Sequence, residues 1–263
     1  RETLVERSKI ASLGATPLGS ENLMDASRPD LAHDTYRLGI SSGFEDRNFL
    51  NPRSQWFQEL HFKFAFHDLL NSDLGYTPFS QLDFPGFTIR FYNQSEQLRF
   101  ENIHFLSLTS LSPLKPLEKH LSWSFHFERL SPKDLVCDHC QVFHFDGGVG
   151  GTLGVGDRNG VIYSLLMPQL ELGSSLKRGF RFVPKWQVGA ILNFSDFYKV
   201  QALGNLVWDI FLETREPNFF DLQLNHSYAL GKSWDFRLTT QAILLGNSSP
   251  RFYEGKLALN YYF

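Results

Sequence analysis

The chain has 263 residues and a formal net charge of −3, and hydrophobic residues make up 42 % of it. This length suits one large β domain or two small ones, and the charge gives no electrostatic reason to expect a nucleic-acid partner. Phe alone accounts for 26 residues, against 2 Cys and 2 Met. No run of about 18 apolar residues occurs, so the sequence excludes a transmembrane helix.

Residues 1–32 differ from the rest of the chain. Leu4–Ser8 is compatible with a short helical piece, and a stretch rich in Gly, Pro, Ser and Asn continues through Pro29. We predict that residues 1–32 are a linker or the tail of an upstream domain, and that residues 33–263 form a single domain.

From His33 onward, apolar and polar residues alternate with a period of two, the pattern of β-strands with two unlike faces. Leu60, Phe62 and Phe64, for example, alternate with His61 and Lys63. The same scheme recurs in residues 36–40, 121–127, 143–155, 186–192, 198–208, 220–228 and 234–244. It predicts about twelve strands of roughly 9–11 residues, long enough to cross a bilayer at a tilt. An even count is what a closed single-chain bacterial barrel requires.

In two segments, 98–109 and 161–172, apolar residues occur at both odd and even positions, and we expect a bulge or a register change in each. Connections expected at 156–160, 193–196 and 231–233 are short. Those at 129–141, 211–219 and 245–251 are longer, as outer-membrane barrels prefer on alternate sides. Two connections, 69–80 and 111–120, fall on the side where short turns are expected but are longer than such turns usually are.

The fold class predicted is therefore all-β: a transmembrane antiparallel up-and-down barrel of about twelve strands in a bacterial outer membrane, with both termini periplasmic. Such a protein must be exported, yet Arg1 opens no secretory signal. We therefore expect a longer precursor, with a signal peptide or a whole domain upstream, and a periplasmic location for residues 1–32.

The last strand carries a candidate assembly signal. Leu257, Leu259, Tyr261 and Phe263 share one face, and this ending resembles the signal that the outer-membrane assembly machinery recognises on its clients. Outer-membrane lipids and that machinery are the expected partners. The alternative, a soluble β-barrel or sandwich ending in Phe, is disfavoured because rows of Phe and Trp would be sticky in water.

Polar and charged residues fall opposite the apolar rows, on the face that lines the lumen of a barrel. The candidate lumenal network comprises Glu59, His61, Lys63, Arg90, His126, Glu128, Arg181 and Arg237. About twelve strands enclose a modest interior, so long side chains of mixed sign favour a filled lumen over a water-filled pore.

Two smaller motifs are ambiguous. Cys137 and Cys140 form a lone CxxC, which favours a local disulfide in an exported protein. Two idle thiols remain an alternative, and structural zinc would need further ligands. His67 beside Asp68 suggests either a catalytic pair lacking an identified nucleophile or a polar end of a strand that holds a loop. The second is favoured, and we expect no metal, cofactor or catalytic residue.

Several phrases resemble the C-terminal barrel of proteobacterial proteins related to the lipoprotein N-acyltransferase Lnb. They span roughly residues 29–263: Pro29–His33, Phe64–Leu70 with Gly75-Tyr76, Ser107–Pro113, Ser122-Trp123, Glu128-Arg129, Gly147–Gly150 and Tyr261–Phe263. The resemblance implies that acyl-transfer chemistry belongs to a Cys and a His in an upstream periplasmic domain, which this chain does not contain.

The leading hypothesis is a membrane module that anchors or scaffolds a periplasmic domain acting on lipoproteins or lipids, fused or associated, with a non-conducting lumen. Three alternatives remain: a self-contained pore or transporter, a barrel enzyme acting on lipids, and a scaffold for another envelope protein. No His-x-Ser pair with a suitable partner supports the enzyme.

Overall fold

The computed structural model describes residues 32–47, 53–115, 120–134, 140–156, 160–211, 218–245 and 250–263. The expected linker, residues 1–32, lies outside these ranges except for Ala32. Within them, no helix is long and apolar enough to cross a membrane.

The strand segments are β1 (Tyr36–Arg47), β2 (Arg53–His67), β3 (Ser80–Tyr92), β4 (Gln97–Ser110), β5 (Ser122–Leu130), β6 (Val142–Val155), β7 (Gly160–Met167), β8 (Gln169–Leu172), β9 (Phe180–Phe182), β10 (Lys185–Ser195), β11 (Tyr198–Trp208), β12 (Asn218–Ala229), β13 (Trp234–Leu245) and β14 (Pro250–Tyr262).

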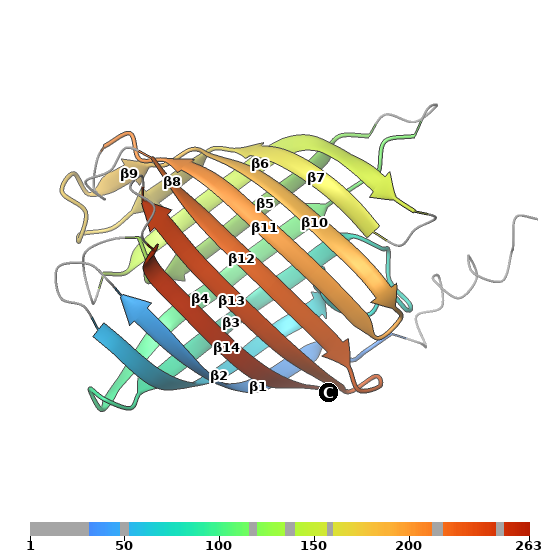
Figure 1. Ribbon diagram of the computed structural model, residues 1–263, viewed down its shortest axis with the longest axis horizontal. Coiled ribbons are helices and arrows are strands. Elements are labelled where there is room, and N and C mark those ends of the chain that lie inside the picture. The colour runs from blue at the N-terminus through green and yellow to red at the C-terminus, as the bar shows by residue number, and fades with distance from the viewer. Residues whose placement is uncertain are drawn as a thin grey trace, which may run out of the picture.

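These segments form a closed antiparallel barrel of twelve strands, which confirms the predicted fold class. Each strand pairs with its neighbours in sequence, and β1 pairs with β14 to close the ring (Figure 1). At that seam the backbone N–H groups of Tyr36 and Phe263 each donate to the other residue's carbonyl, at 3.2 and 3.1 Å. Closure leaves no open sheet edge, which a barrel in lipid requires.

Two barrel strands are each interrupted by a proline. β8 continues β7 beyond Pro168, and β10 continues β9 beyond Pro184, with one register on both sides of each break. This register places the two prolines opposite each other, and neither has an N–H to donate to the ladder. Their carbonyls still accept from the flanking strands, Pro168 from Gly147 and Pro184 from Trp208, so the ring stays intact.

The two segments that are apolar on both parities have different structures. In β4, Glu101 and Phe105 are extra residues relative to the neighbouring strands, so the bulge expected in 98–109 is confirmed. In 161–172 the expectation was wrong: the register does not change there, and the strand breaks only at Pro168. Its inward side is apolar because Val161, Tyr163, Leu165 and Met167 pack inside the barrel.

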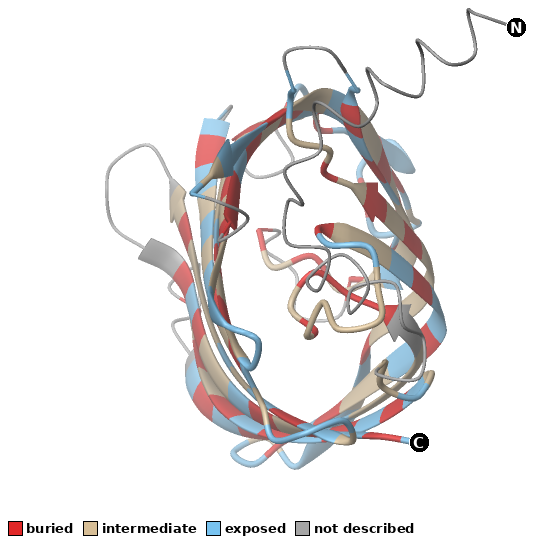
Figure 2. Ribbon diagram, turned by 90° about the vertical axis from the view of Figure 1, so that its right-hand side faces the viewer, coloured by how far each residue is buried: buried red, intermediate tan, exposed pale blue. Residues whose placement is uncertain are grey.

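The outer and inner faces are opposite in polarity. Outward residues such as Leu38, Ile40, Trp186, Phe220 and Leu257 are exposed large hydrophobics, whereas the alternate inward residues are buried and mostly polar. Figure 2, which looks along the barrel, shows a ring of alternating buried and exposed residues with further segments inside it. Hydrocarbon outside and a polar interior are the arrangement of outer-membrane barrels.

The barrel has two unlike ends. The end that holds Tyr36 and Phe263 is here named the terminal end, and the opposite one the distal end. From β6 onward, short connections at the terminal end (156–159, 196–197) alternate with longer connections at the distal end (173–179, 209–217). The last two connections, 230–233 at the terminal end and 246–249 at the distal end, have the same length. The long terminal-end connections 68–79 and 111–121 are the two that depart from this pattern.

Large inward side chains lie over glycines of the adjacent strand. The Phe57 ring fills the space beside Gly43, where a Cβ atom would come within 2.4 Å of the ring and 2.6 Å of the Gly255 carbonyl oxygen. Tyr163 covers Gly189 in the same way. These glycines let bulky side chains fill the lumen without spreading the strands.

We therefore expect Gly43→Leu to prevent barrel closure, because neither the ring nor the backbone can retreat; overpacking of this kind costs about 1–3 kcal/mol or more. The heat-modifiable mobility of the folded barrel on gels measures this. Gly204→Ala, where the nearest side chain would be at 3.5 Å, is the matched control and should fold normally. Normal folding of Gly43→Leu would contradict the packing argument.

Candidate functional site in the barrel lumen

The lumenal face carries all eight residues of the candidate network. Glu59, Arg90 and Arg181 are buried, and His61, Lys63, His126, Glu128 and Arg237 are partly buried. The structure gathers them into groups at different heights in the barrel, so they do not form a single site.

Arg90 is the centre of the distal group. Its guanidinium contacts three carboxylates, Glu254 at 2.8 Å, Glu59 at 2.8 Å and Glu45 at 3.0 Å, and lies 3.7 Å from the centre of the Phe57 ring. Lys256 adds a second cation to Glu59 at 3.0 Å. One arginine thus joins β1, β2, β3 and β14 from the inside.

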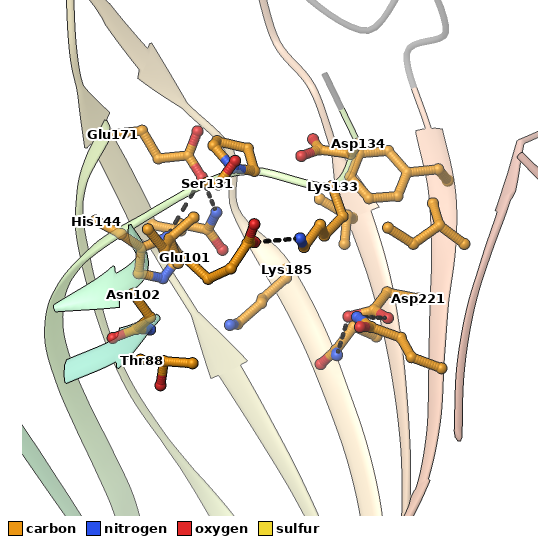
Figure 3. Close-up of a pocket in the computed structure, with 18 of the residues that line it drawn as sticks. Thr88, Glu101, Asn102, Ser131, Lys133, Asp134, His144, Glu171, Lys185 and Asp221 are labelled. Atoms are coloured by element: carbon orange, nitrogen blue, oxygen red, sulfur yellow. Dashed lines mark hydrogen bonds and ion pairs between the residues drawn. The ribbon is translucent and has the colours of Figure 1, made fainter. Parts of the chain in front are cut away.

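Residues 131–134, which follow β5, lie in the lumen beside this group. Lys133 contacts Glu101 on β4 at 2.5 Å, and the adjacent Asp134 contacts Arg181 on β9 at 2.8 Å. Arg181 also binds Glu171 at 2.7 Å and is almost fully buried. Figure 3 shows Lys133 and Asp134 on this segment and the contact with Glu101. Residues 131–134 therefore connect β4 to β9 inside the barrel near the distal end.

At the terminal end, the connection 68–79 occupies the lumen. Asp68 pairs with Arg37 on β1 and with Arg237 on β13, the latter at 2.8 Å. Asp73 pairs with Lys199 on β11 at 2.7 Å. Asn71 accepts a hydrogen bond from the Tyr262 hydroxyl on β14 at 2.9 Å. The connection follows β2 and is held by side chains of β1, β14, β13 and β11.

Residues 68–79 inside the lumen, together with the apolar cluster around Leu69, Phe79 and Leu111, are here named the terminal plug. Leu69, Phe79 and Leu111, from the two long connections, pack against the inward residues Val161, Tyr163, Leu165, Met167 and Ile191. The apolar inward face of β7 is therefore explained by the side chains that these two connections place against it.

Two cavities remain between these obstacles. The distal one has a volume of about 390 Å³ and is bounded by residues 131–134. The terminal one has a volume of about 370 Å³ and is bounded by residues 68–70. Both reach Glu59, Thr88, Asn102 and Lys256. The bulge at Glu101 turns that residue and Asn102 toward the distal cavity together. Cations and carboxylates are mixed in both linings.

The ion pairs of Asp68 with Arg37 and Arg237 hold connection 68–79 against the barrel wall at neutral pH. Burial alone would raise the pKa of the Asp68 carboxyl, but the nearby cations of Arg237, Arg37 and Lys63 outweigh this and hold the pKa well below its usual value. Its Oδ1 atom also accepts from the backbone N–H groups of Leu70 and Asn71, at 3.0 and 3.1 Å. Asp68 therefore both shapes the connection and binds it to the wall.

This contact geometry favours a structural role for His67 and Asp68. The His67 ring stacks on Tyr76 with 4.3 Å between ring centres, and its Nε2 atom lies 3.8 Å from Asp73. Asp68 faces the two arginines. Among the described residues, no group of three or more His, Cys, Asp or Glu is placed to hold a metal ion.

Two further groups of predicted residues have separate positions. Cys140 is buried, but Cys137 lies outside the described residues, so the disulfide remains a prediction. Leu257, Leu259, Tyr261 and Phe263 lie on the lipid-facing side of β14, where the Tyr261 and Phe263 rings stack at 5.7 Å. Their role as an assembly signal also remains a prediction.

Sequence reasoning missed several residues that this lumen uses. Arg37, Glu45 and Glu254 belong to the same inward parity as the predicted network, so stricter counting along each strand could have found them. Asp73, Lys133 and Asp134 lie in connections, where no periodicity indicates an inward direction. Alternation in 143–155 places Asp146 on the inward face, but its contacts depend on the register between β5 and β6.

Fold and site together define an integral outer-membrane β-barrel. Residues 26–262 match the model of a family described as a domain of unknown function, DUF7840, and the chain belongs to that family. No curated protein sequence is similar enough to match it.

Solved structures share the architecture at low sequence identity. The COG4313 outer membrane channel from Pseudomonas putida F1 is 8 % identical, with a TM-score of 0.53, and the match covers 89 % of this chain and 97 % of the channel. The NanC porin is 7 % identical with a TM-score of 0.49, covering 86 % and 98 %. The transport unit of the autotransporter AIDA-I from Escherichia coli is 9 % identical with a TM-score of 0.46, covering 96 % and 94 %. At such identities the likeness shows the fold alone.

We expect Arg90→Met to destabilise the barrel by about 3–5 kcal/mol, because it leaves three buried carboxylates without their shared cation. The urea midpoint of the folded protein in micelles, followed by tryptophan fluorescence, measures the change. Adding Glu254→Gln to the variant removes one uncompensated charge and should restore part of the loss. An unchanged midpoint for Arg90→Met would show that the cluster contributes nothing.

Protonation of Asp68 should loosen the terminal plug. Because the folded pKa is depressed, its stabilisation is fully present above the ordinary value of 3.8 and is lost as pH falls through the lower folded value. Wild-type connection 68–79 should therefore remain docked at pH 5, whereas Asp68→Asn should mimic the loosened form at neutral pH. Hydrogen exchange of residues 69–78 at both pH values measures this, and equal protection in the two proteins would contradict it.

Proposed function

We propose that the chain is a non-conducting membrane module that anchors or scaffolds a periplasmic domain acting on lipoproteins or lipids. One observation carries the proposal: residues 68–79 near the terminal end and residues 131–134 near the distal end lie in the lumen, each held by ion pairs to barrel strands. A barrel whose interior is filled with its own connections is suited to holding a position in the membrane.

The terminal end is the proposed periplasmic side. It carries Tyr36 and Phe263 together, and the turns 156–159 and 196–197 there are short, as periplasmic turns are in such barrels. A domain joined before residue 32 would lie next to the terminal plug. The resemblance to Lnb-related proteins supports a lipoprotein-modifying partner, with the lipid surface itself as the barrel's environment.

A second candidate is a pore or transporter. The two cavities, of about 390 and 370 Å³, favour it because they reach shared residues near Glu59 and Lys256. The known channel from Pseudomonas putida shares the fold. Displacement of both inward segments would turn the lumen into a continuous path.

Planar-bilayer conductance separates the two candidates. The wild-type barrel should give no steady openings, whereas a variant with residues 70–77 shortened to a glycine-rich turn, together with Lys133→Gly and Asp134→Gly, should conduct. The variant serves as the control for insertion, because its currents show that silence of the wild type is due to its plugs. Steady wild-type channels would support the pore and overturn the anchoring module.

A further inference from the structure

A chain of three side chains in the lumen has the geometry of a nucleophilic hydrolase. Ser124 and His126 are two residues apart on β5 and so share its inward face, and Asp146 on β6 is the register partner of His126. The Ser124 Oγ atom lies 3.3 Å from His126 Nε2, and His126 Nδ1 lies 2.6 Å from Asp146 Oδ1. Nucleophile, base and orienting carboxylate thus follow in the order that acyl transfer requires.

Asp146 is held so that one oxygen serves His126. Its Oδ2 atom accepts from Lys185 at 2.6 Å and contacts His144 Nε2 at 3.2 Å, while Oδ1 contacts only His126 among the interactions of the described residues. The carboxylate is almost fully buried. A general base at this position needs the tautomer in which Nδ1–H donates to Oδ1 and Nε2 accepts from Ser124.

Ser124 lies where the polar lumen meets the apolar plug. The Thr109 hydroxyl on β4 is 2.7 Å from its Oγ atom, which also lies 3.4 Å from the Leu108 carbonyl oxygen. Its register partner is Gly148, and the Met167 side chain fills the space beside that glycine, 2.5 Å from where a Cβ would be. Met167 belongs to the apolar cluster with Leu165 and Leu111. One side of the serine is therefore polar and the other apolar.

The group is reachable from the lumen through His126. That side chain is 27 % exposed although it faces inward. His144 and Lys185, which both hold Asp146, line the distal cavity (Figure 3). Ser124 itself is 4 % exposed, so an ester has to approach through the exposed part of His126.

Ser122 provides an internal comparison. It lies on the same strand and the same face, but its hydroxyl contacts Thr152 at 2.6 Å and the backbone of Ser112 at 3.1 Å, with no imidazole. Its contacts connect the segment that follows β4 to β6. Ser124 likewise has a threonine hydroxyl, Thr109 at 2.7 Å, and a backbone carbonyl, Leu108 at 3.4 Å, and differs from Ser122 in its additional contact with an imidazole.

We propose that Ser124, His126 and Asp146 form a catalytic site that hydrolyses carboxylic esters of small, slender acyl groups. The Ser124 oxygen attacks the ester carbon while His126 Nε2 takes the hydroxyl proton. The ester C–O bond then breaks, and the imidazolium returns the proton to the departing alcohol. Water attacks the acyl-serine by the same route, releasing the carboxylic acid and regenerating the hydroxyl. This activity is separate from the anchoring role, and either can fail alone.

The test is covalent labelling of the folded chain in micelles with a fluorophosphonate probe, together with hydrolysis of p-nitrophenyl acetate and butyrate. Wild-type protein should be labelled on Ser124, as mapped by mass spectrometry. Ser124→Ala should abolish the labelling and lower ester hydrolysis by at least about 10²-fold, and His126→Gln should lower both by a similar factor. Asp146→Asn should reduce the rate of hydrolysis while leaving Ser124 in place.

Ser122→Ala is the matched control and should retain labelling and hydrolysis. Each variant is compared only when its heat-modifiable mobility shows a folded barrel, and His126→Asn, which keeps a polar lumenal group, replaces His126→Gln if that variant does not fold. An unlabelled folded wild type, label on another residue, or hydrolysis unchanged in Ser124→Ala would overturn the proposal.

Discussion

Ion pairing across the lumen is the interaction on which the rest of this structure depends. Strict alternation sends half of each strand's side chains to lipid and half inward, and here the inward half contains many charges. Charges removed from water are costly unless they are paired. Arg90 with three carboxylates, Arg181 with Glu171 and Asp134, and Asp68 with Arg37 and Arg237 meet that requirement. Each group joins several strands, or a strand and a connection, from inside the barrel.

The same requirement explains why connections enter the barrel. In the described lumen, the partner of Lys199 is Asp73 from a connection, and Arg181 binds Asp134 from a connection in addition to Glu171 on β8. Burying Leu69, Phe79 and Leu111 against β7 adds an apolar contribution at the terminal end. Filling, pairing and packing therefore act together, and the glycines beneath Phe57 and Tyr163 make room for them.

The fold could be predicted from the sequence because a period of two is a local signal that survives in every strand. Parity likewise indicated which residues face inward, including Glu59 and Arg90. Contacts between groups could not be predicted, since they depend on register and on chain reversal. The apolar inward face of 161–167 suggested a register change, although its cause is the packing of Leu69, Phe79 and Leu111, from two earlier connections. The Ser124, His126 and Asp146 arrangement was hidden for the same reason: no spacing in the sequence tells which residue of β6 lies opposite His126.

The contacts of connection 68–79 also impose an order on the making of the barrel. Its partners lie 126 residues further along the chain for Asp73 with Lys199 and 191 residues for Asn71 with Tyr262. Contacts of such long sequence separation form late in folding. Lys199, Arg237 and Tyr262 come into position only when β11, β13 and β14 have joined the ring. Residues 68–79 are synthesised early, but their contacts with Lys199 and Tyr262 can form only after the last strands have joined the barrel. The connection therefore reaches its final position in the lumen only when the barrel closes.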